Sequence, residues 1–123
     1  MARIPIVKVG NNLIATVDED LTDHDAVVFQ EVLNARLEQA NTTGVLIDVT
    51  AVETIDSFLG RLLNEIALGA RLLGARTVVA GVQPAVAMTL VELGLTLEGV
   101  QTSLTPERGL AMLNRTNGRR PQG

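Results

Sequence analysis

The chain has 123 residues, 46% of them hydrophobic, and a formal net charge of −4 at pH 7. That length suits one domain, and the dominance of aliphatic side chains is typical of an α/β protein whose strands are covered on both faces. Two Phe, no Trp or Tyr and an acidic balance leave little surface for stacking bases or binding phosphates, so we expect no nucleic-acid partner.

Missing residue types and segments narrow the function further. There are no cysteines, which excludes disulfides and thiolate chemistry and is compatible with a cytoplasmic protein. No basic segment followed by an apolar one opens the chain, so we expect no signal peptide. The most apolar stretch, residues 77–97, is interrupted by Gln83, Pro84 and Glu92, and we expect no membrane span. The acidic balance favours basic protein partners.

The first 40 residues predict a hairpin and a helix. Two short β-rich runs, residues 4–9 and 13–17, are separated by Gly-Asn-Asn, which tolerates a tight turn. Thr22 and Asp25 then have the spacing of a capping box. A stripe of apolar residues at helical spacing follows, so we expect a helix from about Asp23 to Ala40.

The middle of the chain alternates strands and helices. Residues 45–49 (VLIDV) form a continuous apolar run with one acid, which predicts a buried strand. From Ser57 to about Gly74, apolar residues recur at helical spacing along one broad face. Another buried strand is predicted at residues 77–82.

The last third predicts two more helices around a strand. Pro84 to Leu93 reads as a short helix followed by a glycine, residues 100–103 as a strand, and Pro106 to about Asn114 as a terminal helix. Residues 115–123 lack apolar periodicity, and we expect a disordered tail there. The order ββαβαβαβα predicts one α/β domain over residues 1–114, with a mixed, mostly parallel sheet covered by helices.

Catalytic constellations receive little support from the residue types. His24 is the one histidine, so a triad would have to combine it with Ser57 and a carboxylate such as Asp48 or Asp56. Nothing in the spacing requires that arrangement, and a histidine in the first turn of a helix is more simply a solvated residue. A small hydrolase with Ser57 as its nucleophile remains the alternative from a different class.

The acidic segment 18–25 fails as a calcium loop. When an EF-hand loop is started at Asp18, Asp23 falls where glycine is needed and Phe29 where the bidentate glutamate belongs. No glycine-rich phosphate-binding pattern follows any predicted strand either. We therefore expect no metal site and no cofactor; the acids complement a helix dipole or meet a basic partner.

Both long helices carry more apolar residues than one core-facing stripe needs. The surplus positions are Val28 and Val32 on the first, and Leu68 and Leu72 on the second. They either cover neighbouring loops or form an interface, because monomers of this size rarely expose a large apolar patch. We expect a homodimer or a larger assembly.

Ser57 lies where two roles are compatible. On physical grounds it is a good N-cap, with a hydroxyl that can accept from the N–H groups near Leu59 and Gly60. A phosphate at the same place would meet the positive end of the helix dipole. It would also add roughly 1.5 to 2 negative charges, which would weaken the binding of any partner docked over that helix end.

Two segments carry a resemblance to a known family. IDSFLGR (residues 55–61) and GVQPAVAMTLVELGL (residues 81–95), together with the order of elements, resemble the STAS domains of anti-sigma-factor antagonists, and within them the RsbS-type scaffolds of the bacterial stressosome. The likeness covers about residues 4–113. In simpler antagonists the Asp-Ser pair is followed by a small turn, whereas Phe58 and Leu59 follow it here, which fits the RsbS branch.

The resemblance implies a non-enzymatic, cytoplasmic switch. Such proteins assemble with RsbR-type STAS paralogues and sequester an RsbT-type serine kinase. The kinase phosphorylates the serine of the pair, here Ser57, and is released, and an RsbX-type phosphatase resets the site. Asp56, Phe58, Gly60 and Arg61 then become the neighbours that dock the kinase, and by its i,i+4 position Arg61 would screen the phosphate. The alternative within the fold is a stand-alone anti-anti-sigma factor that binds an anti-sigma kinase.

Overall fold

The computed structural model describes residues 4–18, 21–39, 41–94 and 100–118. Its elements follow the predicted order ββαβαβαβα. The strands are β1 (Ile6–Val9), β2 (Asn12–Thr16), β3 (Gly44–Asp48), β4 (Arg76–Ala80) and β5 (Gln101–Ser103). The helices are α1 (Asp23–Gln39), α2 (Ser57–Leu72), α3 (Pro84–Glu92) and α4 (Pro106–Gly118).

The five strands form one sheet in the order β1-β2-β3-β4-β5. β1 and β2 pair antiparallel as the predicted hairpin, and the remaining neighbours pair parallel. Gly10, with a φ of 62°, supplies the left-handed residue that this two-residue turn needs. The mixed, mostly parallel sheet predicted from the alternation of elements is confirmed.

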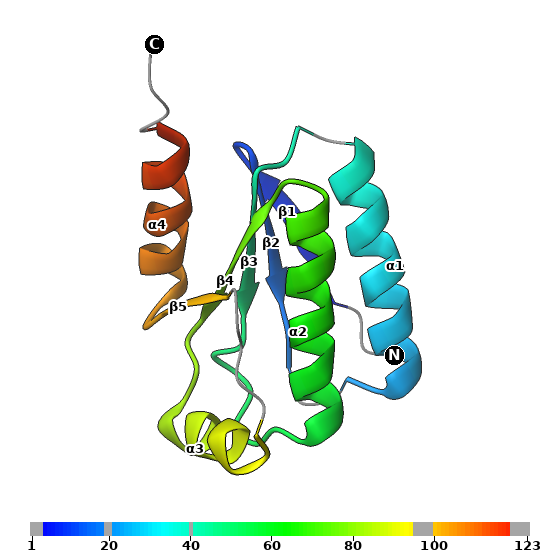
Figure 1. Cartoon of the computed structure of the whole chain (residues 1–123), viewed down its shortest axis with the longest axis vertical. Helices are drawn as coiled ribbons and strands as arrows, with labels where there is room; N and C mark the ends of the chain where they lie inside the picture. The colour runs from blue at the N-terminus through cyan, green and yellow to red at the C-terminus, as the bar shows by residue number, and fades with distance from the viewer. Residues whose placement is uncertain (1–3, 19–20, 40, 95–99, 119–123) are drawn as a thin grey trace.

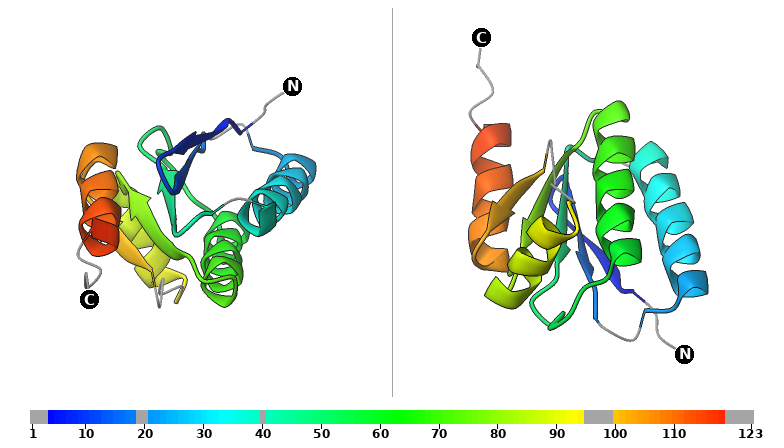
Figure 2. Two further views of the ribbon diagram at one scale, coloured as in Figure 1. Left: turned by 90° about the horizontal axis from the view of Figure 1, so that it is seen from above. Right: turned by 60° about the horizontal axis from the view of Figure 1, so that its bottom comes forward.

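Helices cover both faces of this sheet. α1 and α2 lie side by side on one face, and α4 lies on the opposite face (Figures 1 and 2). The larger core fills the space between the sheet and α1 and α2, and α3 adds Val86 and Leu90 to it. The smaller core lies under α4 and consists of Leu46, Val78, Ala80 and Leu113. The continuous apolar runs of β3 and β4 are therefore explained by burial on both sides.

The structure corrects the end of the terminal helix. α4 continues to Gly118, so residues 115–118 are helical and not part of a disordered tail. The sequence RTNG offered no apolar periodicity because this last turn extends past the edge of the smaller core, whose last member is Leu113. The rest of the predicted tail, residues 119–123, lies outside the described residues.

The surplus apolar residues of the long helices are on the surface. Val28, Val32, Leu68 and Leu72 are all exposed, and Leu72 retains 78% of its accessible area. They therefore do not cover neighbouring loops within the monomer. Among the described residues, no helix is both long and apolar enough to cross a membrane.

Candidate functional site

Three helices begin at the same edge of the sheet. β2, β3 and β4 are parallel, so their carboxyl ends lie together, and α1, α2 and α3 follow from these ends (Figure 1). Such an edge is where open α/β sheets usually place their binding sites. The loop between β3 and α2 brings the Asp56-Ser57 pair to it.

Short-range contacts fix the beginning of that loop. Asp48 Oδ1 accepts hydrogen bonds from the backbone N–H and the hydroxyl of Thr50, at 2.9 and 2.6 Å. The Gln83 side chain, at the start of α3, donates to the Thr50 carbonyl at 2.8 Å. Gly81 has a φ of 80°, and a Cβ there would lie 2.2 Å from the Thr50 hydroxyl. The loop thus packs directly on the backbone that leads into α3.

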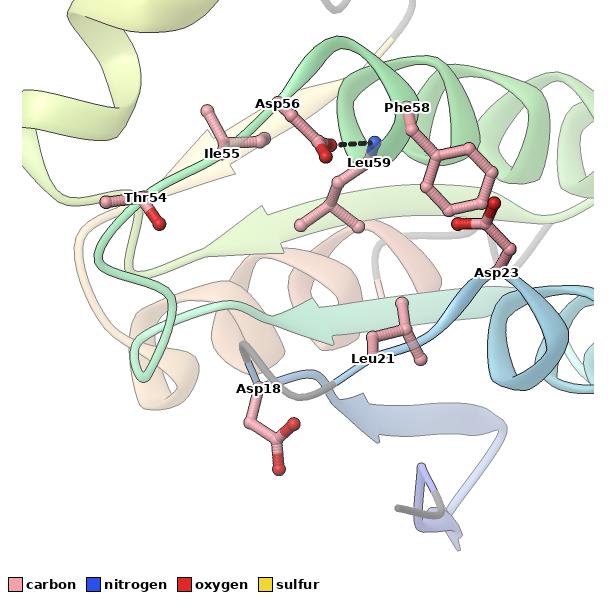
Figure 3. Close-up of a pocket in the computed structure, with 8 residues that line it drawn as sticks. All are labelled: Asp18, Leu21, Asp23, Thr54, Ile55, Asp56, Phe58 and Leu59. Carbon is pink, nitrogen blue, oxygen red and sulfur yellow. Dashed lines mark hydrogen bonds between the residues drawn. The ribbon is translucent and has the colours of Figure 1, made fainter. Parts of the chain in front are cut away.

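The N-cap of α2 is Asp56. The prediction from the sequence, which placed Ser57 at the cap, is wrong by one residue. Asp56 has extended backbone angles, and its Oδ1 accepts from the Leu59 N–H at 2.9 Å (Figure 3). Its carbonyl accepts from Gly60 at 3.1 Å. Aspartate and serine rank alike as caps, but the aspartate also places a negative charge at the positive end of the helix dipole. The carboxylate therefore takes the position, and Ser57 becomes the first helical residue.

Ser57 consequently has an uncommitted hydroxyl. The residue is half-buried. Within the described parts of the chain its Oγ makes no hydrogen bond, and it is not among the polar atoms that are buried without a partner. The oxygen therefore keeps some solvent-accessible area, and its hydrogen-bonding capacity is unused.

An acidic cavity opens at the start of α2, where Asp56 and Phe58, the two neighbours of Ser57 in the sequence, are among its lining residues. It has a volume of about 390 Å³ and lies between the segment after β2, the start of α1 and the start of α2 (Figure 3). Three aspartates, Asp18, Asp23 and Asp56, are among its lining residues, one from each segment. Phe58 and Leu59 form part of its apolar side. We call this cavity the acidic pocket.

A second, smaller hollow lies along the groove between α1 and α2. It has a volume of about 150 Å³, and Val27, Phe58, Arg61 and Glu65 are among its lining residues. Phe58 lines both hollows and separates them. Arg61 is exposed, so the groove presents a cation about one turn from Ser57.

The predicted docking residues differ in what they offer to a partner. Asp56 and Arg61 are exposed and Phe58 is half-buried, so each presents a side chain at the surface. Gly60 is buried within α2 and presents nothing there. The acidic pocket was not predicted as a unit, although a signal was present: parallel neighbouring strands bring the residues after β2 and those before α2 to the same edge.

The described residues do not form the catalytic triad or the metal site that were considered from the sequence. His24 is exposed in the first turn of α1, and among the described residues it has no hydrogen bond to Ser57. The Asp48 carboxylate is engaged by Thr50. Within the described segments, no three His, Cys, Asp or Glu side chains are placed so that they could hold one metal ion. Residues 19 and 20 of the failed calcium loop lie outside those segments.

Comparison with known proteins assigns the chain to a family. The STAS domain model matches residues 3–107 of the chain. The chain belongs to the STAS domain family. This confirms the resemblance drawn from IDSFLGR and from the stretch that begins at Gly81.

Solved structures that resemble this chain include an RsbS protein and a component of the stressosome. An RsbS variant of Moorella thermoacetica is 38% identical, with a TM-score of 0.85 over 95% of this chain and 99% of that chain. A protein in the structure of the stressosome, a signal integration and transduction hub, is 39% identical, with a TM-score of 0.82 over 94% of this chain and 100% of that one. Both likenesses therefore extend over more than nine-tenths of the chain.

Longer relatives match as well. The RsbT co-antagonist protein RsbRA of Bacillus subtilis is 30% identical over 111 residues, which are 86% of this chain and 39% of RsbRA. The chain therefore spans well under half the length of that relative. The anti-sigma factor antagonist SpoIIAA is only 15% identical, and its TM-score of 0.73 shows the shared fold alone.

Proposed function

We propose that this protein is a phosphoregulated scaffold of the stressosome type, which sequesters an RsbT-type serine kinase and releases it when Ser57 is phosphorylated. It acts in the cytoplasm as a binding protein and not as an enzyme, and it needs no cofactor. The observation that carries the proposal is the open Ser57 hydroxyl at the start of α2, beside a capping carboxylate.

The position of Ser57 supports a switch that leaves the fold intact. A phosphate there lies at the positive end of the α2 dipole, which favours negative charge. The hydroxyl makes no hydrogen bond that phosphorylation would break. The modified protein is therefore expected to keep its core and change only its surface.

The charges around Ser57 support release of the kinase. A kinase that phosphorylates Ser57 must bring the phosphates of ATP against this hydroxyl. After transfer, roughly 1.5 to 2 new negative charges face the remaining nucleotide phosphates across the interface. Asp23 and Asp56 already make this surface negative. Repulsion and the desolvation of a dianion then weaken the complex.

The named relatives support the choice of partners. The curated relatives are RsbT co-antagonists, and a protein of similar length and 39% identity occurs in a stressosome structure. We therefore propose RsbR-type STAS paralogues as assembly partners and an RsbT-type kinase as the sequestered client. The resemblance drawn from the sequence adds an RsbX-type phosphatase that restores Ser57.

Intact-mass analysis after incubation with the kinase and ATP tests the proposal. We expect one added phosphate on the wild-type protein, mapped to Ser57 by peptide analysis, and none on Ser57→Ala. Ser57→Ala should retain the kinase in a pull-down with ATP, whereas Ser57→Asp should fold normally and hold it weakly. A phosphate that maps to another residue would contradict the site.

The size of the assembly separates the scaffold from a stand-alone antagonist. A scaffold forms particles of many subunits when mixed with an RsbR-type paralogue. A stand-alone anti-anti-sigma factor stays small and instead captures an anti-sigma kinase. Sedimentation velocity of the mixture distinguishes the two.

A further inference from the structure

The residue that sets the geometry of the phosphoacceptor is Asp56. We infer that Asp56 is a positioning residue for Ser57: by capping α2 through its bond to the Leu59 N–H, it makes Ser57 the first helical residue and leaves the Ser57 hydroxyl free to accept a phosphoryl group. This inference rests on the proposed phosphorylation of Ser57 and assigns a physical role to the residue beside it.

Adjacent residues compete for the cap at this helix start. A helix leaves its first N–H groups without intrahelical partners, and serine and aspartate are both preferred acceptors for them. If Asp56 lost its side-chain oxygen, Ser57 would be the next residue able to cap, and its bond would go to the Gly60 N–H, three residues on. Ser57 would then leave helical geometry, and its oxygen would be engaged by a donor.

The engaged hydroxyl would be a poorer acceptor of phosphate for two reasons. A lone pair that binds a backbone N–H is less available to attack the phosphorus of ATP. The change from helical to extended backbone at Ser57 would also redirect its Cβ, and a misplacement of about 1 Å at a reacting group lowers rates by up to about 100-fold. Asp56 prevents both changes by occupying the cap itself.

The surroundings hold the Asp56–Leu59 bond in place. Leu59 is buried in the larger core, and Ile55, the residue before Asp56, packs against the same core. The cap bond therefore joins two anchored points on either side of Ser57. The Ser57 residue is held between these two points, while its hydroxyl oxygen makes no hydrogen bond.

Three variants separate this role from a direct electrostatic one. Asp56→Asn keeps a capping oxygen and removes the charge, because asparagine caps as well as aspartate. Asp56→Ala removes both. Thr105→Ala is the matched control: the Thr105 hydroxyl accepts from the N–H of Arg108 at 3.1 Å, which is the same cap geometry at the start of α4.

Steady-state phosphorylation by the partner kinase, followed by intact mass on the full chain, is the first measurement. For Asp56→Asn we expect kcat close to the wild-type value, whereas loss of the charge that Asp56 offers to a docked kinase would change KM. For Asp56→Ala we expect kcat to fall between about tenfold and 100-fold, with KM changed no more than in Asp56→Asn, because both variants lose the charge and Asp56→Ala alone loses the positioning of Ser57. Thr105→Ala should match the wild type in both constants.

Amide hydrogen exchange on the same proteins is the second measurement and needs no kinase. In Asp56→Ala the Leu59 N–H should lose protection, because its acceptor, Asp56 Oδ1, is removed. In Asp56→Asn the Leu59 N–H should stay protected.

The outcomes distinguish this inference from the proposed function. If wild-type Ser57 is phosphorylated and Asp56→Ala is phosphorylated equally fast, the inference is wrong and the switch stands. If Asp56→Asn and Asp56→Ala lose activity equally, the charge and not the cap matters, and the inference is wrong. If the kinase leaves wild-type Ser57 unmodified, the proposed function fails and the inference fails with it.

Discussion

The starts of α1 and α2 lie at the same edge of the sheet and are capped in different ways. At α1 the predicted capping box is present: Thr22 Oγ1 accepts from the Asp25 N–H at 3.1 Å, and Asp25 Oδ2 accepts from the Thr22 N–H at 3.3 Å. The hydroxyl is fully committed to the helix. At α2 the cap is the carboxylate of Asp56, and the neighbouring hydroxyl of Ser57 has no such duty.

This difference shows how one edge can provide both stability and a reactive group. A hydroxyl used as a cap is fixed by its bond, so it contributes to the helix and is withdrawn from chemistry. A hydroxyl one residue after a cap shares the same dipole and remains available. The position relative to the cap, and not the residue type, separates Thr22 from Ser57.

Of the substitutions that distinguish the starts of α1 and α2, Gly81→Ala should have the largest effect on stability. The new Cβ meets a φ of 80° and would lie 2.2 Å from the Thr50 hydroxyl, so it strains the backbone and pushes on the loop that leads to α2. We expect a loss of about 2 to 3 kcal/mol in the free energy of unfolding. Exchange protection should fall at the Leu59 N–H and stay unchanged at the Asp25 N–H.

Gly74→Ala is the control for the cost of placing an alanine at a positive φ angle. Gly74 has a φ of 88°, and a Cβ there would meet no atom within 4 Å. We expect it to cost about 1 kcal/mol and to leave the start of α2 unchanged. Equal effects of the two substitutions in urea unfolding would mean that the contact with Thr50 does not support the loop.

A smaller effect should follow from Thr22→Ala, which alters α1 alone. Loss of the capping hydroxyl should lower the free energy of unfolding by about 1 kcal/mol. The rate of Ser57 phosphorylation should stay at the wild-type value, because the α2 cap is intact. A parallel fall in phosphorylation would show that the two helix starts act as one unit.

Much of this architecture could be predicted because the periodicities of its elements are strong. The runs VLIDV and TVVAGV have the length and composition of buried strands, and the Thr22–Asp25 spacing identified the start of α1 to the residue. The end of α4 was missed because its last turn has no apolar partner, so no pattern marks it.

The site was harder to predict because its decisive feature is a choice between adjacent residues. Asp56 and Ser57 both have side chains that favour the cap, and no spacing rule separates them. The acidic pocket depends on the register of β2 against β3, which brings residues about 40 positions apart to one edge. Neither feature has a local signature.

The start of α2 carries the phosphoacceptor Ser57, whereas its C-terminal end carries exposed leucines. The smallest effect on stability is expected at this C-terminal end. Leu72 is 78% exposed, so Leu72→Lys should change the free energy of unfolding by less than about 0.5 kcal/mol and leave Ser57 phosphorylation unchanged. Its effect should fall on self-association, because a charge in an apolar contact between two copies is left unpaired.

Leu104→Lys is the matched control for that prediction. Leu104 is 74% exposed and lies two residues before α4, the helix on the opposite face of the sheet from α2 (Figure 2). Sedimentation equilibrium should show weaker self-association for Leu72→Lys than for Leu104→Lys. Equal association of both variants and the wild type would mean that the exposed leucines of α2 take no part in assembly. Of the two ends of α2, only the one at Ser57 would then contact a partner protein.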